Sequence, residues 1–577
     1  MLTVTNPEDI NWATMPKEDL LLGNALDSFV TLHLAHNLTL PKESQQINLL
    51  LSKCIPIFNE MEEGGLDVNT KLLTEITDNL IKDISVIQKS LDNNSVFKKF
   101  CAFDSSVTEF KLSSKLLNGF FKWFDNQVET GQSEDLLDFI GVNRSPKTNQ
   151  YSFNEVNLLK IESEFARLAN KLKKPYPNQI IQTKEEEKWL SANRLIQDLM
   201  KLRRMKKLHD SYFATATAII EREKSSKLYC NYNLTGTVTG RISCEGMSYN
   251  RKKYGVSMHT LPRNTDFNFR DVITPSEKER EDGWLFVTVD YSTMELRVMA
   301  QACQDPAFKT AFQNGDDLHL LTAAKIFNKR EEDVTKEERQ TGKMVNFLTL
   351  YGGGPKRLAE ELQISILKAK TIIKDYNKAF PNIDRFKKKV IKYLTTFDQS
   401  LSLFGRVRRL KDTYSTVSKD KMERFRVERQ AVNAIIQSTA SDILLATLVN
   451  LDFYFKEKNI RGRLVATVHD SIELVIHPSD LFTHFQEIME LFHKPDLQKA
   501  GISTLYSYPL QPLTRENQQG SYLKESPISE WEIPFKVDIE VGPSFGSNIG
   551  IDFEESNGKY LITNPYEVSN YINNIYG

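Results

Sequence analysis

The sequence has few cysteines and no hydrophobic run long enough to cross a membrane. Its five cysteines are scattered among 577 residues without CxxC spacing, which argues against a disulfide framework or a zinc site and fits a reducing compartment. No apolar stretch approaches the roughly 20 residues of a bilayer span. The first residues show no basic segment followed by an apolar core, the pattern of a signal peptide. We therefore expect a cytoplasmic protein with no membrane partner.

The chain also lacks an excess of charge of either sign. It carries 75 basic and 76 acidic residues, for a net charge of −1, so its bulk charge does not indicate a nucleic-acid partner. Local basic clusters do occur, at Lys201–His209, Asn250–Gly255, Arg385–Tyr393 and Gly405–Lys411. Such a cluster is more often a solvated surface, but several in a neutral protein allow a basic groove that is balanced by acid elsewhere.

The length and the hydrophobic periodicity indicate several domains of mixed structure. At roughly 150 residues each, the chain has room for about four domains. Helical periodicity extends over Asn48–Lys89, Val156–Lys227 and Glu428–Leu451, whereas Trp284–Ser292 and Trp531–Gly542 are typical of strands. Strands with interposed helices, flanked by helical regions, predict an α+β core with helical appendages.

One apolar run is interrupted by polar residues at its centre. Leu464–Ile476 reads LVATVHDSIELVI, a pattern that predicts a buried hairpin. His469, Asp470 and Ser471 together suggest a hydrolase triad, but successive strand residues point to opposite faces, and the members of a triad usually lie far apart in sequence. From this segment alone, a tight polar turn between two strands is the simpler interpretation.

A second aspartate ends another apolar strand. Asp290 closes the run LFVTVD, and Asp470 lies in the interrupted run. Two carboxylates carried by two buried strands are the basic requirement of a two-metal site for phosphoryl transfer, and magnesium is bound by carboxylates together with substrate phosphates. Taken singly, either aspartate could merely end a strand or cap a helix.

Cations and aromatics share one face of a predicted helix. Arg339, Lys343, Phe347 and Tyr351 lie four residues apart, a spacing that places them on one slowly drifting face. The two cations could hold a triphosphate, and the aromatics could stack on a base or a sugar. The alternative is an ordinary amphipathic helix with basic residues in solvent and aromatics in the core.

Several segments resemble, in order, the motifs of family A DNA polymerases, the group of bacterial DNA polymerase I and many phage replicases. Asp290–Ala300 (DYSTMELRVMA), Arg339–Gly352 (RQTGKMVNFLTLYG) and Val465–Leu474 (VATVHDSIEL) resemble motifs A, B and C. TGTVTGRIS, ERQAVNAIIQSTASDIL and KVDIEVGPSFG support the match, which extends from about Asn48 to Gly546. The resemblance implies an α+β right-hand polymerase fold with a palm sheet, helical fingers and a helical thumb.

The resemblance also implies domain boundaries. Residues 1–50 would be a remnant of an exonuclease-like helical region, and residues 50–235 would form the thumb. Residues 236–325 would be the first part of the palm, and residues 326–415 would be the fingers. Residues 416–577 would complete the palm and add a C-terminal insertion and tail.

The resemblance further implies a catalytic centre that uses two magnesium ions. Asp290 and Asp470 would bind both ions, helped by the backbone carbonyl of Tyr291. Lys343 would be placed to protonate the departing pyrophosphate. These roles imply template-directed extension of a DNA primer from 5′ to 3′ with deoxynucleoside triphosphates.

The same resemblance assigns contacts to the incoming nucleotide. The residues concerned are Arg339, Lys343, His319, Glu295, Phe347 and Tyr351. The three basic side chains would hold the triphosphate, and the glutamate would block a ribose 2′-hydroxyl and so select deoxynucleotides. The phenylalanine would pack on the incoming sugar and base, and the tyrosine would stack beside the templating base.

Contacts to primer-template DNA are implied at five further positions. Arg241, Asn433 and Gln437 would read minor-groove acceptors that every correct base pair shares. Arg429 precedes Asn433 by four residues on the same predicted helix, and His469 would lie near the primer terminus. The competing interpretation is a non-catalytic subunit that binds primer-template DNA through a degenerate palm, which would require a lost metal ligand.

Three segments depart from the family pattern. The residue after Asp470 is often Glu in the family but is Ser471 in this chain, which weakens any role as a third ligand. Cys244–Gly255 (CEGMSYNRKKYG) lengthens the approach to the Ser257–Pro262 segment with basic and aromatic residues, either as an extra phosphate contact or as a solvated loop. His477–Trp531 is a long link of unassigned role.

The N-terminal region departs further. Leu20–Leu38 resembles the last helix of the family's 3′–5′ exonuclease domain, with Gly23 where the family has Tyr and Asp27 at the aspartate position. An amphipathic helix unrelated to an exonuclease is the alternative. We therefore expect a polymerase without its own proofreading activity, with a separate exonuclease or processivity subunit as a candidate partner on residues 1–50. A phage-encoded chain would act in the host cytoplasm.

Overall fold

The structure is a computed structural model. It describes residues 44–126, 135–145, 148–171, 184–263, 266–410, 414, 420–508, 524–556 and 559–576. The helix expected over Leu20–Leu38 lies outside these residues, and so does most of the region to which an exonuclease remnant was assigned.

A five-stranded antiparallel sheet forms the centre of the molecule. Its strand order is β10 (Gly462–Val468), β11 (Ser471–Ile476), β7 (Leu285–Tyr291), β14 (Val537–Gly542) and β15 (Ile549–Ile551). The central strand β7 is buried at every position except Asp290, as expected for a β-branched run covered on both faces. The hairpin predicted over Leu464–Ile476 is confirmed as β10 and β11.

One long helix packs along this sheet. α19 (Lys421–Lys458) contacts β10 and β11, and it also packs against α2 (Gln45–Gly64), α11 (Met294–Cys303) and α17 (Pro381–Phe397). By length and hydropathy, α19 is the one described helix that could cross a membrane, but 89% of its most apolar window is buried within the protein. Its apolar surface is therefore occupied by core packing.

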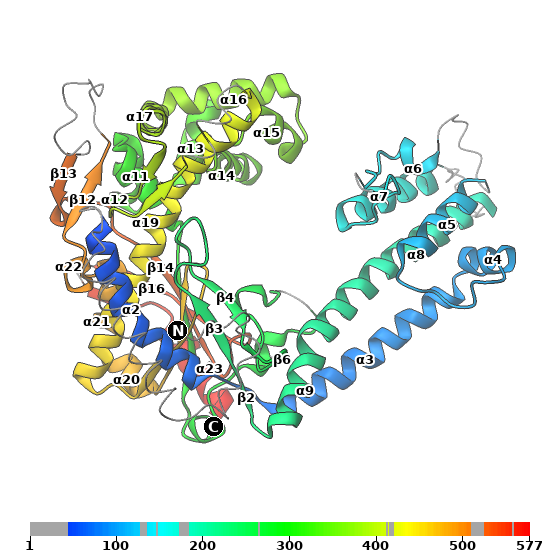
Figure 1. The fold of residues 1–577 in the computed structure, drawn as a ribbon, viewed down its shortest axis with the longest axis horizontal. Coiled ribbons are helices and arrows are strands. Elements are labelled where there is room, and N and C mark those ends of the chain that lie inside the picture. Colours follow the sequence, from blue (N-terminus) through cyan, green and yellow to red (C-terminus); the bar gives the residue numbers. More distant parts are fainter. Residues whose placement is uncertain are drawn as a thin grey trace, which may run out of the picture.

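Two long helices project from the main body of the molecule and carry a small helical tip. α3 (Thr70–Asn93) and α8 (Lys184–Leu208) run side by side and extend away from the rest of the molecule (Figure 1). The tip contains α4 (Ser95–Phe103), α5 (Ser114–Asp125), α6 (Leu136–Phe139) and α7 (Glu155–Lys171). Its core is a cluster of aromatic rings that includes Phe97, Phe120, Phe124, Phe165 and Trp189. Aromatic side chains from several short helices therefore form the core of this tip.

A second group of helices packs beside α19, away from the projecting pair α3 and α8 (Figure 1). It contains α12 (Pro306–Asn314), α13 (Leu318–Phe327), α14 (Lys336–Leu350), α15 (Pro355–Leu362) and α16 (Ile366–Ala379), and it is completed by α17. α13 and α14 pack closely at Gly342, where a Cβ atom would stand 2.3 Å from the carbonyl oxygen of His319. This close approach fixes how the α14 face is presented towards the sheet.

The remaining elements are short. Between α8 and β7 lie α9 (Ala214–Glu223), β2 (Lys227–Leu228), β3 (Cys230–Asn233), β4 (Ser243–Gly246), β5 (Ser248–Tyr249), β6 (Lys252–Lys253) and α10 (Glu277–Glu281); β1 (Leu66–Asp67) pairs with β2. β8 (Gln399–Leu401) and β9 (Val407–Arg409) form a hairpin before α19. The long link after β11 folds into α20 (Pro478–Thr483), α21 (Phe485–His493), α22 (Leu497–Ala500), β12 (Thr504–Ser507) and β13 (Lys524–Pro527). The chain continues through β16 (Phe553–Ser556), β17 (Lys559–Ile562) and α23 (Pro565–Tyr576).

Candidate active site

The two predicted aspartates lie at the same end of the central sheet. Asp290, near the end of β7, is paired with Ser471 at the start of β11, and Asp470 precedes Ser471 in the turn from β10. The backbone N–H of Tyr291 donates to the carbonyl oxygen of Asp470 at 3.1 Å. This bond fixes the turn against the end of β7 and so places the two carboxyl-bearing residues beside each other.

Negative charge accumulates around Asp290. The pKa of Asp290 is raised to about 6, chiefly by burial; Asp470, Asp538 and Glu540 contribute to the rise, while Arg263 opposes it. Asp538 lies directly opposite Asp290 on β14. Asp538 and Glu540 were not among the predicted site residues, although their alternation in KVDIEVG indicates one polar strand face.

The donor set fits a hard divalent cation that is completed by substrate. Carboxylate oxygens are ligands that magnesium prefers, and magnesium commonly keeps only one or two protein carboxylates together with water and phosphate oxygens. Within the described residues, no group of three or more His, Cys, Asp or Glu side chains forms a ready-made metal cluster. Asp290 and Asp470 would therefore hold a metal only with backbone carbonyl, water or phosphate oxygens as further ligands.

A buried glutamate lies two residues further along β11 from the residue that pairs with Asp290. Glu473 is fully buried on β11, and it accepts hydrogen bonds from Ser471 Oγ at 2.6 Å and from Thr288 Oγ1 at 2.5 Å. Burial raises the pKa of Glu473 to about 7. Because Ser471 pairs with Asp290 and Glu473 pairs with Thr288, all four residues face the same side of the sheet. Ser471 thus acts as a hydroxyl donor to a carboxylate two residues further along the strand.

Sequence reasoning missed Glu473. It is the one acidic residue in the otherwise apolar run SIELVI, and burying a carboxylate is costly unless it is paired or hydrogen-bonded. That isolated acid was the available signal. Its hydroxyl partner Thr288 comes from a strand 185 residues away in the chain, and the sequence alone does not supply that pairing.

Glu295 is held from two sides. It lies in the first turn of α11 with 4% of its surface exposed. Arg241 Nη2 donates to Glu295 Oε1 at 2.5 Å, and Tyr351 Oη donates to Glu295 Oε2. Burial raises the pKa of Glu295, and these two partners oppose the rise. The same guanidinium lies 3.8 Å from Asp470 Oδ1, so Arg241 links Glu295 to the aspartate pair.

The stripe predicted on one helix face borders a cavity. Lys343, Phe347 and Tyr351 line a cavity of about 260 Å³ on the exposed side of α14. Arg339, one turn before Lys343, donates from Nε to Asp317 Oδ2 at 2.7 Å and is about half exposed. Lys343 is exposed, so its ammonium group can reach an anion bound over this face.

His319 lies next to this stripe in a neutral state. Its Nδ1 is 3.1 Å from Asn346 Nδ2, and its ring centre is 5.8 Å from that of Phe347. Burial lowers the pKa of His319 to about 4, with Arg339 and Lys343 contributing. At neutral pH the amide N–H of Asn346 donates to Nδ1, so Nε2 carries the ring proton. His319 can therefore offer a hydrogen bond to a phosphate but not a full positive charge.

The predicted DNA contacts on α19 follow one face of the helix. Arg429, Asn433 and Gln437 are spaced by four residues, and Asn433 Oδ1 is buried without a hydrogen-bond partner among the described residues. A buried amide oxygen without a partner is unusual in a folded protein. Arg429 packs against Gly352, where a Cβ atom would stand 2.5 Å from the arginine Cγ.

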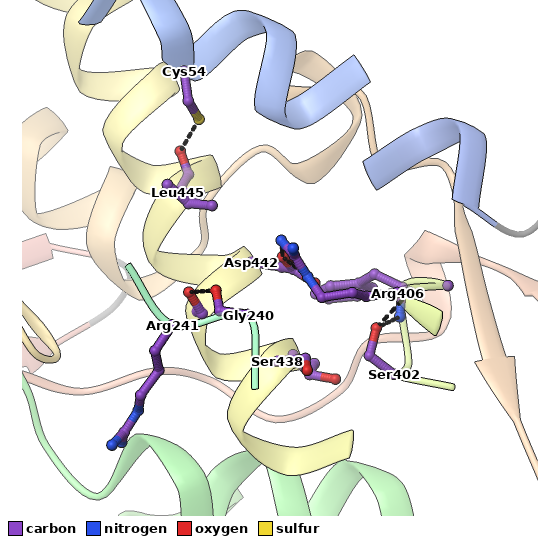
Figure 2. Close-up of polar contacts among 12 residues, drawn as sticks. Cys54, Gly240, Arg241, Ser402, Arg406, Ser438, Asp442 and Leu445 are labelled. Atoms are coloured by element: carbon purple, nitrogen blue, oxygen red, sulfur yellow. Dashed lines mark hydrogen bonds and ion pairs between the residues drawn. The ribbon is translucent and has the colours of Figure 1, made fainter. Parts of the chain in front are cut away.

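The loop that carries Arg241 is attached to the same helix (Figure 2). Ser438 Oγ donates to the carbonyl oxygen of Thr239 at 2.7 Å, and Ser441 Oγ donates to that of Gly240 at 2.8 Å. Gly240 has a φ of 76°, and a Cβ atom there would stand 2.7 Å from Arg406 Cδ. Both the left-handed backbone conformation and the lack of space for a Cβ atom therefore require glycine at position 240.

Arg406 is oriented by a buried aspartate on α19. Asp442 has no exposed surface, and its Oδ1 accepts from Arg406 Nη2 at 2.5 Å and from Nε at 3.2 Å (Figure 2). Burial raises the pKa of Asp442 despite the opposing effect of Arg406. The ion pair connects the turn after β8 to α19 and backs the loop that ends at Arg241.

His469 occupies the turn beside Asp470. Its φ is 60°, a left-handed conformation that is uncommon outside glycine. Its ring centre lies 5.3 Å from that of His259, and His259 Nε2 is 2.9 Å from the carbonyl oxygen of Thr467. Burial lowers the pKa of both histidines.

The side chain of Tyr291 points into the core, where its hydroxyl lies 2.6 Å from Thr447 Oγ1. Only the backbone of Tyr291 is therefore available to the site.

The comparison with protein families decides the identity. Residues 155–500 match DNA polymerase family A, and this range covers more than half of the chain. The chain belongs to this family. The family A match includes β7 with Asp290, the β10–β11 turn with Asp470, the α14 stripe and the α19 face. The resemblance inferred from the sequence motifs is confirmed.

Similar proteins include bacterial and phage polymerases. The family A chain is 28% identical to DNA polymerase I of Borreliella burgdorferi over 62% of its length, and 27% identical to that of Helicobacter pylori over 85%. It is 29% identical to a DNA polymerase of Bacillus phage SP01 over 49% of its length. The chain covers 37%, 49% and 30% of these relatives, respectively, so it spans half of their length or less.

A solved structure has the same fold. The POL domain of Pol1 from M. smegmatis, in complex with DNA primer-template and dNTP, matches with a TM-score of 0.58 at 20% identity, covering 86% of this chain and 70% of that one. At this identity the likeness concerns the fold. The family A chain therefore has the α+β polymerase fold expected from its sequence.

Proposed function

We propose that this chain is a template-directed DNA polymerase that extends a primer from 5′ to 3′ with deoxynucleoside triphosphates. The observation that carries the proposal is the convergence of Asp290 and Asp470 at one end of the central sheet, opposite Glu295 and Tyr351. Family membership and a cavity lined by Lys343 and Phe347 support it. Primer-template DNA and deoxynucleotides are the proposed partners.

We propose magnesium as the cofactor of this site. Asp290 and Asp470, with the backbone carbonyl of Tyr291, would hold two ions, which when bound would lower the charge on the reacting phosphates. Burial and the neighbouring carboxylates together raise the pKa of Asp290, and the accumulated negative charge favours a cation at this position.

The chain's own side chains would orient and protonate the reactants. Arg339 and Lys343 would bind the triphosphate as cations, and neutral His319 would add a hydrogen bond. Lys343 would donate its ammonium proton to the leaving pyrophosphate oxygen. Phe347 would pack on the sugar and base, and Glu295 would occupy the space that a ribose 2′-hydroxyl needs.

The DNA contacts are proposed on the surface that leads away from the aspartates. Arg241, Asn433 and Gln437 would read minor-groove acceptors at the primer end, where the unpaired Asn433 Oδ1 has room for a partner. Arg429 and His469 would contact the neighbouring strand segments. We assign residues 50–235 to the thumb, residues 236–325 and 416–577 to the palm with its C-terminal insertion, and residues 326–415 to the fingers.

We further propose that this chain has no proofreading exonuclease activity of its own. The motif comparison over Leu20–Leu38 motivates this proposal, and a separate exonuclease or processivity subunit remains a candidate partner on residues 1–50. Removal of a mismatched primer 3′ end by the purified chain with magnesium would contradict the first statement. A pull-down with and without residues 1–45 tests the second.

Primer extension by Asp290→Ala tests the main proposal. The variant should lose essentially all extension and keep wild-type affinity for primer-template DNA, because the carboxylate acts on the reacting phosphates and not on the duplex. Asp282→Ala, at the other end of β7, is the matched control and should extend normally. Full extension by Asp290→Ala would contradict a polymerase role for this site. Absence of extension by the wild type would favour the alternative, a non-catalytic DNA-binding subunit.

A further inference from the structure

A short basic hairpin projects from the segment between the Arg241 loop and His259. β5 and β6 pair Ser248 with Lys253 and Tyr249 with Lys252, and the two-residue turn between them has φ values of 48° and 63°. Two positive φ values define a tight type I′ turn, whose twist matches that of the strands. All six residues from 248 to 253 are exposed.

The base of this hairpin is rigidly attached to the protein. The N–H of Tyr254 donates to the carbonyl oxygen of Met247 at 2.8 Å, and the N–H of Tyr229 donates to that of Tyr254 at 3.0 Å. Gly255 lies so close to Tyr229, the residue before β3, that a Cβ atom would stand 1.7 Å from the carbonyl oxygen of Tyr229. Arg222 on α9 donates to the carbonyl oxygen of Lys253 and lies over the Tyr254 ring. The hairpin is thus held in a fixed direction.

Its tip combines cations with an aromatic ring. Arg251, Lys252 and Lys253 are exposed, and none of them forms an ion pair with the residues that the structure describes. The Tyr249 side chain is 69% exposed. A merely solvated loop does not need such an attachment, whereas three cations on a rigid support lose little conformational freedom when they meet a fixed row of negative charges.

The strands that lead to the tip start at the candidate active site. Arg241, two residues before β4, touches Glu295 and Asp470, and His259, after β6, contacts the turn that carries His469. Tyr249 follows Arg241 by eight positions, so it lies at most about 26 Å from Arg241 along an extended strand. This distance corresponds to about eight steps of duplex DNA at 3.4 Å each.

We propose that the β5–β6 hairpin binds the phosphate backbone of duplex DNA behind the primer terminus. This inference rests on the proposed polymerase function, because it takes the duplex to begin at Arg241. Arg251, Lys252 and Lys253 would neutralise phosphates within about eight base pairs of the primer end, and the Tyr249 hydroxyl would donate to a phosphate oxygen. Such contacts add affinity without sequence preference.

The salt dependence of DNA binding tests this proposal. In the triple variant Arg251→Asn, Lys252→Thr, Lys253→Thr, the slope of log Kd against log salt concentration should fall by about 2–3, since each neutralised phosphate contributes about 0.9. Anisotropy with a labelled primer-template and no nucleotide measures this without catalysis. The control is Lys278→Ser, Lys456→Ser, Lys458→Ser, three exposed cations at the end of the sheet away from Asp290, of which Lys456 and Lys458 form ion pairs, and its slope should match the wild type.

DNA with uncharged phosphate analogues tests whether the hairpin contacts the duplex backbone. Methylphosphonates placed within about eight positions of the primer end should abolish the difference between the wild type and the hairpin triple variant. An unchanged slope in that variant would overturn the proposal, as would a difference that follows the length of the single-stranded overhang. A wild type that binds DNA with the expected slope but does not extend primers would refute the polymerase function and leave the hairpin contact standing.

Discussion

The guanidinium of Arg406 and the carboxylate of Asp442 form an interior ion pair that backs the loop ending at Arg241. Asp442 has no exposed surface, and the Arg406 side chain is 15% exposed. Gly240 packs directly on the arginine. The loop is held by its contacts with α19 and with Arg406, and its own sequence contributes mainly the glycine that allows the fit.

Asp442→Asn should therefore destabilise the protein and loosen Arg241. Loss of one member of a buried pair typically costs about 3–5 kcal/mol, measured here by urea unfolding. Ser441→Ala removes only the hydroxyl that bonds Gly240 and should cost about 1 kcal/mol. If the loop positions Arg241, Asp442→Asn should also extend mismatched primers more readily, and this change should vanish in an Arg241→Ala background. A change of the same size in that background would contradict the positioning role.

Glu295→Ala should weaken selection against ribonucleotides. Removing the buried carboxylate opens the space proposed for exclusion of the 2′-hydroxyl, and a steric contact of this size changes selectivity by about 10–200-fold. Single-nucleotide incorporation of ATP against dATP measures the ratio. Tyr351→Phe, which loses only the hydroxyl bonded to Glu295, should shift the ratio much less. Unchanged selectivity in Glu295→Ala would remove the steric role.

Glu473→Gln should change how stability depends on pH. Because burial raises the pKa of Glu473 to about 7, well above the ordinary value of a glutamate, the folded state holds a proton that the unfolded state releases. The wild type therefore loses stability as the pH rises from about 4.5 to about 7. With a chelator present to remove divalent metal, the free energy of unfolding of the variant should not fall over this pH range. At pH 8 the variant should be more stable than the wild type, by about 3 kcal/mol at most. Equal pH profiles for the two proteins would contradict a protonated Glu473.

The raised pKa of Asp290 predicts acid-sensitive metal binding. A protonated carboxyl cannot ligate a metal, so the affinity should fall about tenfold per pH unit below the pKa of about 6. Titration of Mn²⁺ into the wild-type chain between pH 5 and 8, followed by electron spin resonance, measures the affinity. Asp290→Asn should bind the ion weakly at every pH. An affinity that is flat across this range would mean that the site takes no metal through Asp290.

Local patterns predicted much of the site. The interrupted run at Leu464–Ile476 gave the hairpin and the turn that carries Asp470, because alternation and turn residues act over a few positions. The four-residue spacing on α14 gave the shared face of Lys343, Phe347 and Tyr351, because helical geometry fixes it. The cavity along that face agrees with this prediction.

Long-range pairings were beyond those patterns. The position of Glu473 depends on the register between β11 and β7, and that of Asp538 depends on the register between β14 and β7. No short-range rule sets either register. The ion pair of Arg406 with Asp442 joins residues 36 positions apart. It holds the arginine against Gly240, a contact that depends on tertiary packing.

The position of Arg241 between Glu295 and Asp470 implies an order of events. One guanidinium partly neutralises both acids, so a cation at Asp470 must compete with it. A primer terminus that draws Arg241 onto its base edges would leave Asp470 with more uncompensated negative charge at that moment. The metal site would thus become strong after the duplex has docked, and a nucleotide carrying its own magnesium would be favoured as the last component to arrive.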